Sequence, residues 1–289
     1  MTAPTCRQAL DAARSLGLDR LDAQLLLLHA LGRAASERAW LVAHDDDVLR
    51  DTVAGLFQQF TTRRAAGEPL AYIVGYKEFF GLQLQVDARV LVPRPDTETL
   101  VEWALEVLAA KGRTSSPATH WQVLDLGTGS GAVALAIGHT LQQQHVPFTL
   151  TALDASADAL AVAADNARRL HVGLNLLESF WFEKVSGHFH VIVSNPPYIA
   201  AHDPHLAALK HEPLQALTAG SDGLNDIRQI INDAPKYLHP DGWLLLEHGY
   251  DQSAEVCGLL AARGFSDVQS RLDLAGIARC SGGRFEMPG

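Results

Sequence analysis

The strongest constraint on the fold is a regular alternation of apolar strands with amphipathic helices in the second half of the chain. The alternation begins with a strand at 122–126 and a helix at 132–141. A strand at 148–153, a helix at 157–170 and strands at 174–179, 191–194, 243–247 and 267–271 follow. Strands that alternate with helices predict a parallel sheet covered by helices on both faces. The fold class is therefore α/β, with a doubly wound sheet.

The N-terminal quarter has a different pattern. Between residues 5 and 64 apolar side chains recur every three or four residues, as at Leu21, Leu25 and Leu28. This spacing predicts four short amphipathic helices. Because short helices are marginal in isolation, we expect a small bundle over 1–74. Its role could be to bind a substrate or only to pack against the larger unit.

A connector at 75–95 separates these two regions. Apolar Leu82, Leu84 and Val86, preceded by Phe80, alternate there with polar Gln83 and Gln85, which predicts a β-hairpin. A helix at 97–110 follows. We therefore divide the chain into a helical bundle at 1–74, a hairpin connector at 75–95 and the α/β domain at 96–289.

Composition and charge exclude several classes of protein. The apolar stretches are far shorter than the ~18 residues that span a bilayer, and the N-terminus does not resemble a signal peptide, so we expect a cytoplasmic protein without membrane contact. A net charge of −10 argues against stable binding to nucleic acid. Three widely spaced cysteines predict neither disulfides nor a thiolate metal site, and no metal is expected at the histidines of 202–211.

A glycine-rich turn follows the first strand of the α/β domain. Its residues are Gly127, Thr128, Gly129, Ser130 and Gly131. The G-x-G-x-G spacing differs from the G-x-G-x-x-G of dinucleotide folds. A tight turn that binds no ligand would also use glycine.

Two carboxyl groups flank this turn. Asp125 precedes it, where a carboxylate suits a cationic amino group, so a methionine-type ligand fits better than a pyrophosphate. Asp154 ends the next strand, 25 residues after Gly129 (154 minus 129), where it can accept both ribose hydroxyls or simply cap a helix. The aromatic run 180–182 could supply a partner for an adenine ring or belong to the core.

The most specific motif is Asn195-Pro196-Pro197-Tyr198, which follows the apolar strand at 191–194. The Asn195 side-chain oxygen and a neighbouring backbone carbonyl can accept hydrogen bonds from a planar NH2 group, and two prolines stiffen the loop. Tyr198 could lie against the flat face of that group. The pattern indicates transfer of a methyl group to an amide or amino nitrogen, where positioning supplies most of the acceleration.

These motifs together resemble the protein-(glutamine-N5) methyltransferases that modify peptide chain release factors, the PrmC or HemK family. The resemblance extends over nearly the whole chain and includes the segments at 79–81, 92–98, 212–217 and 246–249. Arg94-Pro95-Asp96-Thr97-Glu98 is the part that looks specific to this family.

The resemblance implies a Rossmann-like, seven-stranded class I methyltransferase domain that uses S-adenosyl-L-methionine. It implies donor contacts from Gly127 to Gly131, Asp154, Trp181 and Asn195, and a substrate clamp formed by Asn195, Pro196, Pro197 and Tyr198. The implied substrate is the glutamine of the Gly-Gly-Gln loop in class I release factors, and we expect a monomer whose N-terminal bundle docks that partner.

The sequence departs from the family pattern at His190, where Asp is common, and at Phe180, where a small or acidic residue is usual. Either Phe180 or Trp181 could therefore contact the adenine. The main alternative is an adenine-N6 nucleic-acid methyltransferase, which shares the Asn-Pro-Pro-Tyr motif but needs a basic recognition region. A regulatory cofactor-binding module and a nucleotide-dependent oxidoreductase are weaker alternatives.

Overall fold

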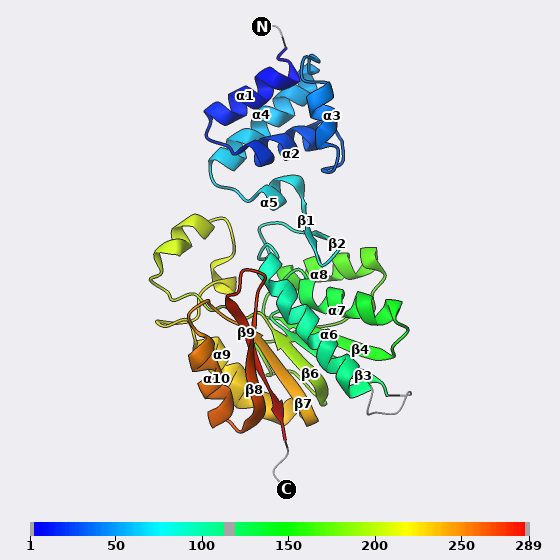
Figure 1. The fold of residues 1–289 in the computed structure, drawn as a ribbon, viewed down its shortest axis with the longest axis vertical. Coiled ribbons are helices and arrows are strands. Elements are labelled where there is room, and N and C mark those ends of the chain that lie inside the picture. Colours follow the sequence, from blue (N-terminus) through cyan, green and yellow to red (C-terminus); the bar gives the residue numbers. More distant parts are fainter. Residues whose placement is uncertain (1–2, 113–118, 287–289) are drawn as a thin grey trace. The chain divides into compact units, whose positions relative to one another are not determined.

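The protein was analysed in a computed structural model that describes residues 3–112 and 119–286. The chain forms two compact units, Met1–Tyr76 and Lys77–Gly289 (Figure 1). Each unit has its own hydrophobic core. Within the described residues, no helix combines the length and the apolar character that crossing a membrane requires.

The first unit is helical. Its helices are α1 (Cys6–Ser15), α2 (Arg20–Ala30), α3 (Arg38–Ala43), α4 (Asp51–Ala65) and α5 (Leu70–Val74). Side chains cap two of the helix starts: Thr5 accepts from Gln8 N and Asp19 accepts from Asp22 N. The periodicity predicted four helices, and α5 was missed because five residues are too few to display a period.

The predicted hairpin connector is present. Strands β1 (Tyr76–Phe79) and β2 (Leu82–Gln85) pair with each other, and Leu82, Leu84 and Val86 are buried as the alternation predicts. Phe80, however, lies in the turn with a positive φ of 51°, and its neighbour Phe79 is the buried aromatic residue. The turn shifts the register at this end of the alternation by one residue.

The second unit contains a seven-stranded sheet in the order β5-β4-β3-β6-β7-β9-β8. The strands are β3 (Trp121–Leu126), β4 (Phe148–Asp154), β5 (Asn175–Glu178), β6 (Phe189–Ser194), β7 (Leu238–Glu247), β8 (Phe265–Leu272) and β9 (Ala278–Phe285). All neighbours are parallel except for β9, which runs antiparallel to both β7 and β8. The predicted doubly wound α/β fold is confirmed.

Helices cover both faces of this sheet, as Figure 1 shows. The helices are α6 (Glu98–Gly112), α7 (Ala132–Gln143) and α8 (Ala157–Leu170) on one face, and α9 (Asn225–Asp233) and α10 (Ser253–Ala262) on the other. Successive residues of one strand enter different cores: Val123 packs with α6 and α7, and Leu124 packs with α9 and α10. This double burial explains the continuous apolar runs in the central strands.

Strand β9 was absent from the strands proposed from sequence. Its central residues include Gly282, and a Cβ there would lie 2.6 Å from the Leu244 carbonyl oxygen. Glycine has a low propensity for strands. The sequence of β9 was therefore not recognised as a strand, because the close approach to β7 requires glycine at its centre.

Candidate active site

One pocket in the second unit lies at the carboxyl ends of β3, β4 and β6. Strands β4 and β6 flank β3 on opposite sides, so the chain changes direction across the sheet at this point. Ligands of open α/β sheets bind at such a switch point. The lining residues come from four regions, namely 89–97, 125–133, 153–159 with 179–181, and 195–226.

The glycine turn forms the wall next to β3. Gly129 has a positive φ of 55°, and a Cβ on it would meet no atom within 4 Å, so its backbone faces open space. Gly127, Thr128 and Ser130 also line the pocket, whereas Gly131 lies at the start of α7 and does not. The turn thus presents bare backbone to a ligand, which is the reason for glycine at Gly129.

Asp125 is a buried carboxyl group in the pocket wall. It is 2% exposed, and its Oδ2 accepts hydrogen bonds from Thr128 Oγ1 at 2.7 Å and from Ala134 N at 3.3 Å. Burial raises the pKa of Asp125 to about 7 despite these two donors. A cationic ligand group would favour the ionised form, so this site suits an amino group.

Asp154 anchors the turn from the neighbouring strand. Its Oδ2 accepts from Gly129 N and its Oδ1 from Ser156 N, both at 2.9 Å. Burial raises the pKa of Asp154, and the backbone donors oppose this effect. A carboxylate can accept about four hydrogen bonds and the backbone donors are Gly129, Ser156 and Ala155, so Asp154 can hold the turn and still accept from a ligand hydroxyl.

Two residues of the aromatic run after β5, Phe180 and Trp181, line the pocket from different positions. Trp181 is 7% exposed, adopts a φ of 42°, and donates from Nε1 to Asp226 Oδ1 at 3.1 Å. Its ring would be 3.5 Å from a Cβ on Gly127, so it forms a fixed wall behind the turn. Phe180 also lines the pocket and is 45% exposed. A flat ligand ring could therefore contact either side chain.

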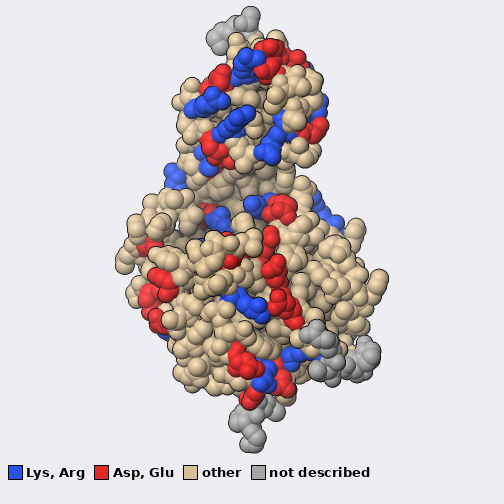
Figure 2. Space-filling view, in the orientation of Figure 1, with Lys and Arg blue, Asp and Glu red and all other residues tan. Residues whose placement is uncertain are grey.

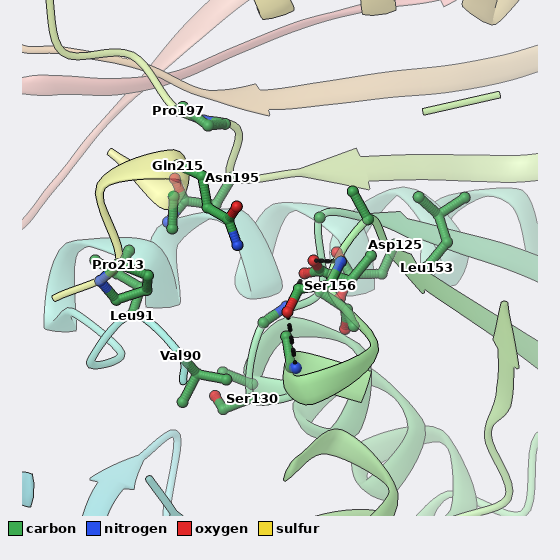
Figure 3. A pocket seen from close by; sticks show the side chains of 18 of the residues that line it. Val90, Leu91, Asp125, Ser130, Leu153, Ser156, Asn195, Pro197, Pro213 and Gln215 are labelled. Carbon is green, nitrogen blue, oxygen red and sulfur yellow. Dashed lines mark hydrogen bonds between the residues drawn. The ribbon is translucent and has the colours of Figure 1, made fainter. Parts of the chain in front are cut away.

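The Asn-Pro-Pro-Tyr loop forms the opposite end of the pocket. Asn195 and Pro197 line it, and Figure 3 shows both beside Gln215, across from Asp125 and Ser156. Asn195 Nδ2 donates to Thr97 Oγ1 at 3.2 Å.

The other two residues of the loop are placed differently. Pro196 and Tyr198 do not line the pocket. The Tyr198 hydroxyl lies 3.3 Å from Glu247 Oε1, and burial raises the pKa of this phenol. Tyr198, which we expected to lie against the flat face of the acceptor group, does not line this pocket and instead directs its hydroxyl group to Glu247.

Two further segments complete this end of the pocket, and sequence reasoning assigned them no role. Val90, Leu91 and Thr97 line it from the segment before α6, and Pro213 and Gln215 from the loop before α9 (Figure 3). Glu212 joins the two segments.

The Glu212 side chain contacts both the backbone and a side chain of the segment before α6. Its Oε2 accepts from Val92 N at 3.0 Å, and its Oε1 pairs with Arg94. The signal that could have revealed this link was the joint presence of the motifs at 92–98 and 212–213.

Comparison with known proteins agrees with this architecture. Residues 5–75 match the family model described as PrmC N-terminal domain, and residues 105–257 match the methyltransferase small domain. A release factor glutamine methyltransferase of Burkholderia pseudomallei is 47% identical over 298 residues, covering 100% of this chain and 99% of the relative. The chain belongs to the release factor glutamine methyltransferase family.

A second member of the family, from Bordetella pertussis, is 46% identical over 271 residues, covering 92% of this chain and 95% of its own. Among solved structures, the hMettl16 catalytic domain in complex with a 3′UTR hairpin aligns with a TM-score of 0.54 at 16% identity, covering 81% of this chain and 82% of that chain. A 16S rRNA methyltransferase from T. Thermophilus, in complex with AdoMet and guanosine, aligns with a TM-score of 0.51 at 18% identity. The alignment covers 72% of this chain and 49% of that chain. At these identities the solved structures show a shared class I methyltransferase fold.

Proposed function

We propose that this protein transfers a methyl group from S-adenosyl-L-methionine to the side-chain amide nitrogen of the glutamine in the Gly-Gly-Gln loop of class I peptide chain release factors. The observation that carries the proposal is that a single pocket holds the glycine turn with its two carboxyl groups at one end and Asn195 at the other. Membership of the family supports the same substrate.

The pocket fits the methyl donor in its chemistry. The buried carboxyl group of Asp125 suits the amino group of the methionine part, and Asp154 has lone pairs free for ribose hydroxyls. Phe180 or Trp181 can lie against the adenine, and the open backbone at Gly129 leaves room for close approach. When bound, the donor supplies a methyl group on a positively charged sulfur.

The acceptor end has the groups that an amide nitrogen needs. Because Asn195 directs its NH2 toward Thr97, its Oδ1 is the end left to accept a hydrogen bond from the substrate amide. That hydrogen bond becomes stronger as positive charge develops on the attacking nitrogen, so it stabilises the transition state more than the ground state. Pro197 keeps the loop stiff, which preserves this geometry before the substrate arrives.

The experiment is a transfer assay with a radiolabelled methyl donor. A class I release factor, the same factor with its Gly-Gly-Gln glutamine replaced by alanine, and duplex DNA containing adenine are incubated in parallel. We expect label in the first sample only, and an initial rate about 10²-fold to 10³-fold lower when Asn195→Ala replaces the parent enzyme at equal concentration. Label in DNA without label in the release factor would refute the proposal and favour the adenine-N6 alternative.

A further inference from the structure

A line of buried polar groups extends from Asn195 away from the pocket. Asn195 Nδ2 donates to Thr97 Oγ1, and the side chain of Thr97 in turn hydrogen-bonds to the carboxyl group of Glu247 at the end of β7. Tyr198 donates to the same carboxyl group. Thr97 is 3% exposed and Glu247 is 1% exposed. The chain of hydrogen bonds therefore connects the pocket wall with the sheet interior.

Glu247 is a costly residue for this place. Its Oε2 is buried and has no hydrogen-bond partner among the residues that the structure describes. A buried carboxyl oxygen without a partner destabilises a fold, and an apolar side chain of similar size would avoid that cost. Packing alone therefore does not account for a carboxyl group here.

We propose that Glu247 is a positioning residue for methyl transfer, which orients the Asn195 amide through the hydroxyl group of Thr97. The inference rests on the proposed function of Asn195. Glu247 does not line the pocket, so it acts only through its neighbours.

The direction of the hydrogen bonds carries the argument. A carboxylate can only accept, so Thr97 must give its single hydroxyl proton to Glu247. Thr97 Oγ1 then has only lone pairs left for Asn195, which must turn its NH2 toward Thr97 and its Oδ1 the other way. If Thr97 were free to donate to Asn195, the reversed amide would be equally satisfied. It would present NH2 to the substrate and could not accept the substrate hydrogen.

Tyr198 supplies a second link between Glu247 and the same loop. Its hydroxyl donates to Glu247, and its backbone carbonyl accepts from Gln252 Nε2 at 3.1 Å. Both ends of Tyr198 are thus held on the side of the loop that faces β7 and α10. Glu247 therefore fixes the loop after Asn195 as well as the amide itself.

The orientation of the Asn195 amide through Thr97 depends on whether Glu247 is ionised. Burial raises the pKa of Glu247 to about 7, and the hydrogen bonds from Thr97 and Tyr198 oppose the rise. The ionisable groups around it are Asp96, Tyr198, His248, Arg279 and Cys280. Asp96 raises the pKa of Glu247 further and Arg279 lowers it. A protonated Glu247 can donate to Thr97, which releases the Thr97 proton and permits the reversed amide. Turnover should therefore fall as the pH falls through about 7.

The test is a double-mutant cycle of Glu247→Gln and Thr97→Val, two substitutions of nearly unchanged shape. The turnover number is measured at saturating donor with a class I release factor from pH 6 to 9. Each single variant should lose about tenfold in kcat, the effect of one positioned hydrogen bond, with donor affinity unchanged by calorimetry. The kcat of the double variant should be no lower than that of the less active single variant, because both residues act through the same series of hydrogen bonds.

Three controls separate positioning from folding. Thr97→Ser keeps the hydroxyl and should retain most activity, and Glu102→Gln changes an exposed glutamate on α6 and should have no effect. Glu247→Gln should abolish the fall in kcat near pH 7 and raise the thermal midpoint, because it removes a buried charge.

Three results with an active parent enzyme would reject the positioning role alone. They are additive losses in the double variant, a parental pH profile in Glu247→Gln, and single variants with the parental kcat. Parent enzyme that leaves the release factor unlabelled would reject the proposed function and this role with it.

Discussion

Replacing Asp125 with Asn should stabilise the protein without its donor and weaken donor binding at the same time. Asp125 is fully buried, and burial raises its pKa from 3.8 to about 7. An asparagine has nearly the same shape, and its oxygen can still accept from Thr128 Oγ1 and Ala134 N. The negative charge is lost, and the second carboxyl oxygen is replaced by an NH2 group.

The stability effect follows from proton linkage. A carboxyl group whose pKa is raised by folding binds more protons in the native state, so stability is lost as the pH rises from 3.8 through 7. At 1.36 kcal/mol for each pH unit, the difference corresponds to about 4 kcal/mol above pH 7. Asp125→Asn should recover an effect of this order at pH 8, and the two proteins should converge in stability near pH 4.

Donor binding should change in the opposite direction. A hydrogen bond to a charged group contributes about 1.5 to 3 kcal/mol, so the donor dissociation constant should rise about tenfold or more in Asp125→Asn. For the parent protein, affinity should fall about fivefold between pH 7 and pH 6, because protonation of Asp125 competes with the cation.

The two measurements are chemical unfolding at pH 8 and pH 5 without donor, and calorimetry over the same pH range with donor. Ser130→Ala, on the same turn, provides a matched variant without a change in charge. Loss of stability in Asp125→Asn at pH 8, or a parental donor affinity independent of pH, would refute the reasoning.

Three further predictions concern the other parts of the site. Asn195→Ala should lower kcat by about 10²-fold to 10³-fold with little change in donor affinity, and Asn195→Asp should bind donor yet turn over poorly. A folded Asn195→Ala protein with near-parental turnover would show that Asn195 only shapes the loop. Asp154→Ala should weaken donor binding by roughly 1.5 to 3 kcal/mol per lost ribose hydrogen bond, and unchanged affinity in calorimetry would reject the ribose contact. We also propose that the N-terminal bundle docks the release factor. Removing residues 1–72 should then raise KM for intact release factor far more than KM for a short peptide, and equal effects would indicate a structural role.

Local patterns were sufficient wherever one segment determines its own structure. The helix predicted at 157–170 has the same bounds as α8, because Ser156 caps its start and its apolar face is periodic. The carboxyl ends of parallel strands meet at one sheet edge, so Asp125, Asp154 and Asn195 could be assigned to one crevice from sequence alone.

Charge was the main property that sequence could not assign. Asp125 and Glu247 have ordinary pKa values in an open chain, and burial raises both to about 7. The opposite case is found on the surface, where Figure 2 shows acidic and basic side chains exposed close to one another. Whether a carboxyl group is buried depends on what packs over it, and this is a property of the whole fold.

The sequence by itself determined the α/β class, the glycine turn and the acceptor loop, because each depends on residues adjacent in the chain. The tertiary structure decided which atoms face the pocket. Tyr198 turns toward Glu247, which lies 49 residues away, and Asn195 binds Thr97 at a separation of 98 residues. Hydrogen bonds between such distant residues leave no periodic trace in the sequence. They form only when the sheet brings β6, β7 and the segment before α6 together, so their direction and partners are set by packing.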